Sequence, residues 1–265
     1  MLRALALSLL LVALTSCCRR GEPPPQTAAD EKPAEAPLQG TPQKQERSRP
    51  SESLITLDGA ETRVTWSDGD TFRIRSGPNA GTQARLHGFN TLEDYGPVHR
   101  WGDWTAKELY EIAGQSGERA RAGTWTCQSA GEKDRYDRLL VRCDDAGLTL
   151  VREGLAFAFS VDGPAPEEWQ AAQREAREQK RGMWRKGTPS HIVSSVHSAS
   201  EGREGREARG YNRVVDARTG YAQVHNHTQT YEVCEEVCVN EGADRSCMTY
   251  VPFERRYKDK AECLR

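Results

Sequence analysis

Five side chains suited to metal or phosphate binding occur in the middle of the chain: Asp70, Arg85, Asn90, Glu93 and Arg138. Carboxylate and amide oxygens are the ligands that a hard cation such as calcium prefers. The guanidinium group of arginine presents a planar fork of donors that suits a phosphate and does not lose its charge. A cation, a carboxylate and two arginines are sufficient parts for phosphodiester hydrolysis. These residue types predict that chemistry if the fold brings them together.

Four of these residues lie in one stretch that has the pattern of a β-hairpin. Apolar and polar residues alternate in segments 72–75 and 83–89, and the loop between them reads GPNAG. This pattern is typical of two strands joined by a turn. The hairpin would bring the DGDT turn (68–71) and the segment 89–94 toward one edge of a sheet. The alternative is that DGDT is an ordinary turn, that Arg85 and Arg138 form surface salt bridges with nearby acids, and that Glu93 is a solvated loop residue.

Segment 54–187 predicts a mixed domain in which short strands are combined with helices. Its last helix, 166–181, begins with Pro-Glu-Glu and ends with basic residues, as the helix dipole favours. Trp101 and Trp104 are expected to pack against the domain. The full pattern predicts strands at 62–66, 72–75, 83–89, 123–128 and 138–143, and helices at 101–113, 148–153 and 166–181.

The start of the chain predicts export. Residues 1–16 contain one early arginine and an apolar run too short to span a bilayer, so we interpret them as a signal peptide. They lead into LTSC, which resembles the lipobox of bacterial lipoproteins and implies lipid attachment at Cys17. The alternative is an ordinary cleaved signal peptide. Residues 17–53 are rich in Pro, Glu, Gln and Ala and predict a disordered tether.

The chain contains eight cysteines, and disulfide bonds are expected among them if the protein is exported. Cys127 and Cys143 lie near the ends of two predicted strands and predict a disulfide; the alternative is two buried thiols. Residues 188–210 are polar and predict a linker, and residues 211–265 predict a small module. The four cysteines of this module favour two disulfides, with three possible pairings, over a zinc site.

Composition limits the kind of surface that the protein presents. Hydrophobic residues make up 36% of the chain and charged residues 29%, which is too polar for one well-packed domain of this length. The formal net charge of -2 excludes a broadly basic surface. Any binding of nucleic acid must therefore come from a local basic cleft.

The order of motifs along the chain resembles that of the thermonuclease family, also called staphylococcal nuclease-like. The motifs are DGDT, ARLHGFNTLE, DRYDR, VREGLAFAF and RGMW, and the resemblance covers about residues 64–184. It implies a mainly β, α+β fold, with a five-stranded OB-fold barrel and about three helices beside the Cys-rich C-terminal module. It also implies hydrolysis of DNA or RNA that releases a 5'-hydroxyl and leaves a 3'-phosphate.

The resemblance implies a role for each matching residue. Asp70, Asn90 and the backbone carbonyl of Thr91 would bind calcium. Glu93 would act as general base for the attacking water, and Asp68 opens the acidic turn. The remaining matches are two catalytic, phosphate-binding arginines, Arg85 and Arg138, and two substrate-binding aromatic residues, Tyr136 and Phe159.

Four positions depart from the family's pattern. Asn90 stands where the family has a second metal-binding aspartate, so calcium affinity is expected to fall. Leu92 replaces a common proline, which predicts a looser loop. Phe159 lies near a stacking tyrosine and retains a ring without the hydroxyl. Asp137 replaces the usual glycine and adds a negative charge beside Arg138.

Three functional hypotheses follow. The first is a calcium-dependent nuclease, monomeric and lipid-anchored to a bacterial membrane in the cell envelope, that acts on DNA or RNA. The second, favoured by Asn90, Leu92 and Asp137, is a catalytically weakened OB-fold module that binds nucleic acid or a protein at the cell surface. In the third, the C-terminal module carries a separate binding role and the nuclease-like domain supports it.

Overall fold

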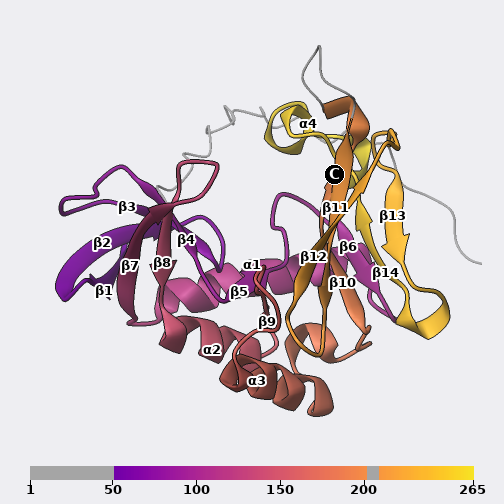
Figure 1. Ribbon diagram of the computed structural model, residues 1–265. Coiled ribbons are helices and arrows are strands. Elements are labelled where there is room, and N and C mark those ends of the chain that lie inside the picture. Colours follow the sequence, from indigo (N-terminus) through magenta and orange to yellow (C-terminus); the bar gives the residue numbers. More distant parts are fainter. Residues whose placement is uncertain (1–50, 202–208) are drawn as a thin grey trace, which may run out of the picture. The chain divides into compact units, whose positions relative to one another are not determined.

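A closed β-barrel forms one end of the molecule (Figure 1). The computed structural model describes residues 51–201 and 209–265, which all belong to one compact unit. The barrel and the mixed α+β composition agree with the prediction, but the barrel has six strands where five were expected. In spatial order these are β1 (Ser53–Leu57), β2 (Ala60–Trp66), β3 (Thr71–Ile74), β4 (Gln83–Leu86), β8 (Leu139–Arg142) and β7 (Thr126–Lys133).

The additional strand is β1, which pairs antiparallel with β2 and parallel with β7 and so closes the barrel. Ile55 and Leu57 of β1 are buried in the core, whereas Leu54 is exposed. This alternation covers only a few residues and directly follows a polar segment, so it does not stand out in the sequence.

Helix α1 (Ala106–Ala122) begins later than predicted because residues 99–101 are extended and form strand β6 (His99–Trp101). Thr105 and Glu108 form a capping box that fixes the start of the helix. Trp101 and Trp104 are buried, as expected, and both indole N–H groups donate to the Met183 carbonyl. The remaining helices are α2 (Asp144–Arg152), α3 (Glu167–Glu178) and the short α4 (Glu254–Tyr257).

The C-terminal part is continuous with the rest of the fold, which differs from the predicted linker and separate module. Within the predicted linker 188–210, β10 (His191–His197) pairs with β11 (Gly210–Asp216). Ile192 of β10 joins the same hydrophobic core as the barrel and helices. The Ser-rich flanks of this strand concealed it in the sequence. The other C-terminal strands are β12 (Ala222–His227), which pairs with β11, and β13 (Glu236–Val239) and β14 (Ser246–Thr249), which form a sheet with β6.

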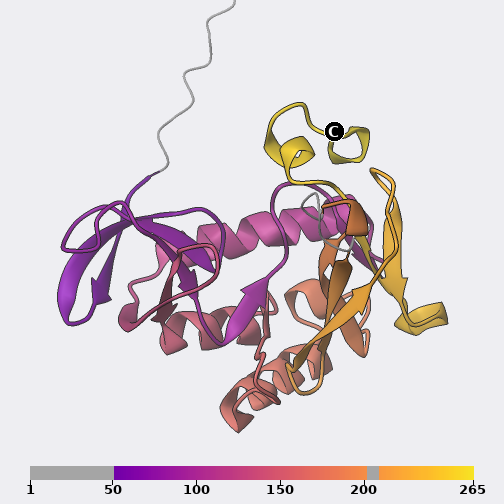
Figure 2. The same ribbon diagram turned by 45° about the horizontal axis from the view of Figure 1, so that its top comes forward.

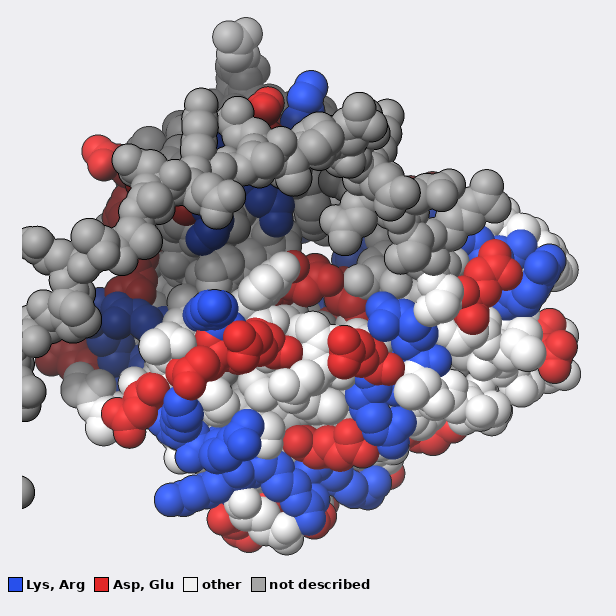
Figure 3. All heavy atoms as spheres, turned by 180° about the vertical axis from the view of Figure 1, so that it is seen from behind, with Lys and Arg blue, Asp and Glu red and all other residues white. Residues whose placement is uncertain are grey.

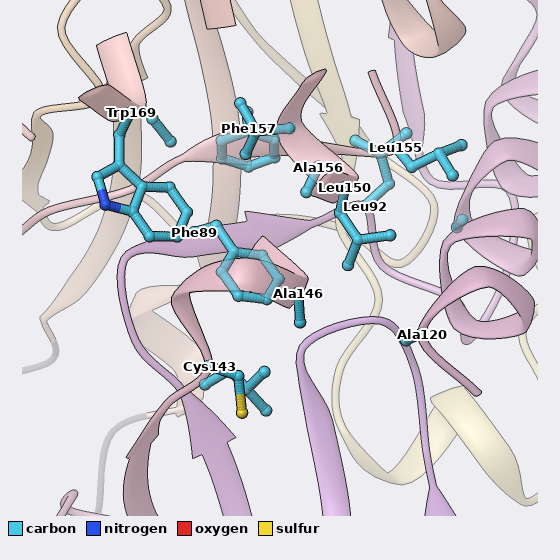
Figure 4. Packing of buried hydrophobic residues seen from close by; sticks show 14 of the residues in the cluster. Phe89, Leu92, Ala120, Cys143, Ala146, Leu150, Leu155, Ala156, Phe157 and Trp169 are labelled. Carbon is cyan, nitrogen blue, oxygen red and sulfur yellow. The ribbon is translucent and has the colours of Figure 1, made fainter. Parts of the chain in front are cut away.

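A two-stranded sheet of β5 (Phe89–Thr91) and β9 (Ala156–Ala158) lies over α2 and α3 (Figure 4). Phe89 stacks on Trp169 of α3, with ring centroids 6.0 Å apart and an interplanar angle of 11°. Leu92 is buried in the same core. Burial of this side chain anchors the chain just before Glu93, and the looser loop expected at Leu92 stays a prediction.

All six cysteines in the described residues form disulfides. The predicted bond between Cys127 and Cys143 is confirmed and joins β7 to the start of α2. In the C-terminal part, Cys234 pairs with Cys263 and Cys238 pairs with Cys247, which selects one of the three possible pairings. Cys238 and Cys247 also lie near the Glu236 carboxylate, but cysteines bonded to each other supply no thiolate for zinc.

The charged surface is mixed. On the face seen from behind, acidic and basic side chains are interspersed, and basic ones gather along the lower edge where α3 lies (Figure 3). Arg174 of α3 pairs with Glu167 at 3.4 Å, and Arg181 pairs with Glu175 at 3.0 Å. Acids therefore offset part of this basic charge.

The predictions for the N-terminus, namely the signal peptide (1–16), lipidation at Cys17 and most of the tether (17–53), lie outside the described residues. Within the described ranges, the helices are too short or too polar to cross a membrane.

Candidate active site

The DGDT turn joins β2 to β3 and carries the most deeply buried carboxylate of the site. The Asp70 backbone N–H donates to Asp68 Oδ1 at 2.9 Å, which stabilises the turn. The Asp70 carboxylate accepts hydrogen bonds from the Thr71 hydroxyl at 3.0 Å and from the Thr91 backbone N–H at 2.8 Å. A further bond from the Thr91 hydroxyl measures 3.0 Å. Asp70 therefore fastens the turn to strand β5.

Arg85 of β4 brings the third segment into the same network. Its Nη1 forms an ion pair with Asp70 Oδ1, and its Nη2 donates to Asn90 Oδ1. The amide of Asn90 in turn donates to the Thr91 carbonyl at 3.3 Å. The Arg85 side chain keeps 17% of its surface exposed and that of Asp70 only 4%. Thus the turn, β4 and β5 meet at one buried carboxylate, as the hairpin pattern predicted.

Gly69 allows the turn to approach α1 closely. A Cβ atom built at this position would lie 2.0 Å from Ser116 Oγ and 2.8 Å from Thr91 Cγ2. The facing residues of α1 are Ser116 and Gly117, both buried. Small residues on both sides therefore set the depth of the turn.

Glu93 lies just beyond β5, and its backbone is held by a histidine that the sequence did not single out. The Glu93 backbone N–H donates to His99 Nε2 at 3.2 Å. His99 of β6 is buried, and burial lowers its pKa to about 4, so the ring is neutral and accepts this bond. Because β6 pairs with β14, the C-terminal part helps to position the Glu93 loop.

The Glu93 carboxyl is protonated more readily than an ordinary glutamate. Burial is the largest cause and the nearby Asp68 the next, and together they raise its pKa to about 7, against the opposing charges of Arg256 and Arg85. A carboxylate with a pKa near neutrality is well matched to general-base catalysis.

The pKa of Arg85 is affected by most of the other charged residues of the site. Burial lowers its pKa to about 10; Asp68 and Glu93 raise it, and Arg138 and Arg213 lower it further. The electrostatic effects indicate that both predicted arginines and Glu93 share one site. The same effects place Arg213 of β11 near Arg85, and the sequence did not indicate this residue.

The guanidinium of Arg138 is held by Asp134, with Nη2 and Oδ2 2.7 Å apart and an Nε bond of 2.8 Å. The exposed Asp137 side chain pairs with Lys133 at 2.8 Å. Its φ is positive, at 63°, a conformation that suits the glycine which the family pattern has at this position. The ring of Tyr136 lies 5.4 Å from the Arg138 guanidinium carbon and is 59% exposed.

The donor groups around Asp70 have the chemistry that a hard cation requires. The Asp70 carboxylate, Asn90 Oδ1 and the Thr91 carbonyl are oxygen donors within one hydrogen-bonded network. They fit calcium by donor type. The guanidinium of Arg85 holds oxygens of both Asp70 and Asn90, so a cation here must compete with it.

These observations define the class of protein: an α+β protein whose closed barrel carries buried carboxylates and arginines at one edge. Residues 83–186 match the model of the family described as staphylococcal nuclease homologue. The chain therefore contains a staphylococcal nuclease-like domain, as the order of its motifs predicted. A comparison with curated proteins gave no match.

The residues that sequence reasoning missed come from outside the predicted hairpin. His99 belongs to β6, and Tyr211, Arg213 and Arg256 belong to the C-terminal part beyond the matched segment. The guanidinium carbon of Arg256 lies 4.6 Å from the centre of the Tyr95 ring, and the charge of Arg256 lowers the pKa of Glu93. No local motif marks these side chains, because tertiary packing alone brings them to the site.

We expect Gly69→Ala to destabilise the protein by about 2 kcal/mol, because the added methyl group overlaps Ser116 and Thr91. Urea denaturation measures this loss. Ser116→Ala is the matched control and should be nearly neutral, since its buried hydroxyl has no partner among the described residues. A loss below about 0.5 kcal/mol for Gly69→Ala would contradict the close packing described above.

We expect Glu93→Gln to be more stable than the native protein above pH 7. The folded-state pKa of about 7 lies above the ordinary value of 4.5, so folding favours the protonated carboxyl. The stability that this group contributes is full below pH 4.5 and is lost as pH rises through about 7. Urea denaturation at several pH values should show that the difference in free energy of unfolding between Glu93→Gln and the native protein grows with pH over this range. Equal pH profiles for the two proteins would contradict the burial of Glu93.

Proposed function

We propose that the protein is a calcium-dependent nuclease that hydrolyses phosphodiester bonds in DNA or RNA. The observation that supports this most strongly is the convergence of Asp70, Arg85 and Thr91 in one network beside Glu93. The match to the staphylococcal nuclease homologue family supports the same reaction class.

The chain's own residues have distinct roles in this proposal. Arg85 and Arg138 bind the phosphate and stabilise the charge that develops on its oxygens. Glu93 takes a proton from the attacking water, for which its pKa near 7 is suited. Bound calcium, held by Asp70, Asn90 and the Thr91 carbonyl, would neutralise charge on the phosphate. By resemblance to the family, the products carry 5'-hydroxyl and 3'-phosphate ends.

Two further residues are proposed to contact the nucleotides. Tyr136 is exposed and lies against Arg138, so a nucleotide whose phosphate binds Arg138 would meet the exposed part of this ring. Phe159 is half-buried after β9 and packs on the core. It retains an aromatic ring but offers no hydroxyl.

The cellular setting is also a proposal. The apolar run of residues 1–16 and the lipobox-like LTSC support export and anchoring through Cys17 to a bacterial membrane. The protein would then act as a monomer in the cell envelope, on nucleic acid that reaches it from outside the cytoplasm.

A catalytically weakened binding module is the second candidate. Asn90 favours it, because an amide in place of a carboxylate leaves the cation site with less negative charge. The engagement of Arg85 by both Asp70 and Asn90 favours it as well, since a phosphate must displace these partners.

The proposal predicts cleavage of denatured DNA with calcium and none with a chelator. Glu93→Gln should lose at least a hundredfold in rate, in keeping with loss of a general base. Asn90→Asp should lower the calcium concentration needed for half-maximal rate, because it adds a ligand charge. Gln128, which is exposed on β7, serves as a matched surface control through Gln128→Glu.

Absence of calcium-dependent cleavage by both the native protein and Asn90→Asp would sink the enzymatic proposal. Cleavage by the native protein that Glu93→Gln leaves intact would instead reject Glu93 as the base.

A further inference from the structure

Arg213 of β11 differs from the other two arginines of the site in its partners. Arg85 is paired with Asp70 and Arg138 with Asp134. Within the described ranges, Arg213 is bonded to no carboxylate, and its buried Nε has no hydrogen-bond partner. It is nevertheless close enough to lower the pKa of Arg85. Arg213 as a whole is half-buried, and a cationic side chain without a carboxylate partner is suited to bind an anionic ligand.

Aromatic rings flank Arg213 on two sides. Its guanidinium carbon lies 5.9 Å from the centroid of Phe159 and 5.9 Å from that of Tyr211. Tyr211 also stacks on His197, with centroids 4.3 Å apart, so its ring is held in place by β10. These contacts orient the planar guanidinium as well as the ring beside it.

The same series of aromatic and arginine side chains continues to the hairpin of β7 and β8. The guanidinium carbon of Arg135 lies 5.4 Å from the Tyr211 ring and 4.8 Å from the Tyr136 ring. Its Nη2 donates to the hydroxyls of both tyrosines. The order is thus Phe159, Arg213, Tyr211, Arg135, Tyr136, Arg138, and it connects β11 with the DRYDR hairpin.

The position of β11 relative to the barrel part is fixed by buried contacts. Ser160, just after Phe159, exchanges backbone hydrogen bonds of 2.8 Å with Gly220 and Ala222. The side chain of Gln173 accepts from Ala158 N–H and donates to the Ala217 carbonyl, both at 2.7 Å. Arg213 and Tyr211 are therefore held beside the site by the packed core.

We propose that Arg213 and Tyr211 extend the substrate site by binding the nucleotide next to the scissile phosphate of a single-stranded nucleic acid. Arg213 binds the neighbouring phosphate. The adjoining base stacks on Tyr211 in place of the Arg135 guanidinium, on the ring face that His197 does not cover. Alternating arginines and aromatic rings are the features that bind an unpaired strand, since phosphates and base faces alternate along it. A duplex hides its base faces, and the net charge of -2 gives no broad field for its backbone.

This inference rests on the proposed function for the place of the scissile phosphate, so binding and cleavage are measured separately. Binding of a fluorescent oligothymidylate is followed by anisotropy in calcium, with Glu93→Gln as the background so that the probe stays intact. Each variant is introduced into the full chain.

Arg213→Gln should weaken binding about tenfold and reduce the slope of log K against log salt by about 0.7, the value for one phosphate contact with a single strand. Tyr211→Leu should weaken binding about tenfold and leave the slope unchanged, because stacking involves no counterion release. Arg213→Lys should leave the slope of log K against log salt unchanged, because lysine keeps the positive charge. Arg174→Ala, which removes an equally positive side chain on α3, should change neither quantity.

The cleavage measurement compares an oligothymidylate with a dinucleoside monophosphate, which contains the scissile phosphate alone. Arg213→Gln should raise KM for the oligonucleotide and leave that for the dinucleoside monophosphate unchanged. An equal rise in KM for both substrates would overturn the assignment of Arg213 to a neighbouring phosphate, whether the rise came from misfolding or from a role at the scissile bond.

Unchanged binding by both Arg213→Gln and Tyr211→Leu would overturn the inference even if the protein is an active nuclease. The predicted binding losses without any cleavage by the native protein would support this surface while rejecting the proposed enzymatic function.

Discussion

The ion pair between Asp70 and Arg85 is the interaction on which the site depends. It joins a turn between β2 and β3 to β4, and the other oxygen of Asp70 holds Thr91 of β5. Such a pair is stabilising only when hydrogen bonds satisfy the remaining lone pairs, and the Thr71 and Thr91 bonds do so here. Removing either charged partner would leave the other buried and unpaired.

Packing on the far side of β5 keeps this arrangement rigid. Phe89 stacks on Trp169, and Leu92 is buried beside the same helices, so residues on both sides of Asn90 and Thr91 are anchored. The backbone of Glu93 is then held by His99 of β6. The site is therefore supported by the core on one side and by strands of the C-terminal part on the other.

The sequence predicted the parts of this arrangement that are encoded locally. The alternation around the GPNAG loop, the DGDT turn and the disulfide between Cys127 and Cys143 each leave a short-range pattern. It did not predict β1 or β10, since their apolar residues lie within polar surroundings. It also missed His99 and Arg213, because pairing of β6 with β14 and docking of β11 depend on contacts between distant segments.

We propose that a bound calcium ion competes with Arg85 for the Asp70 carboxylate. Calorimetric titration of calcium into the native protein and Arg85→Gln tests this most directly. Because the substitution removes both the competing ion pair and a nearby positive charge, the account predicts that Arg85→Gln binds calcium several-fold more tightly. Equal or weaker binding by a folded Arg85→Gln variant would contradict it.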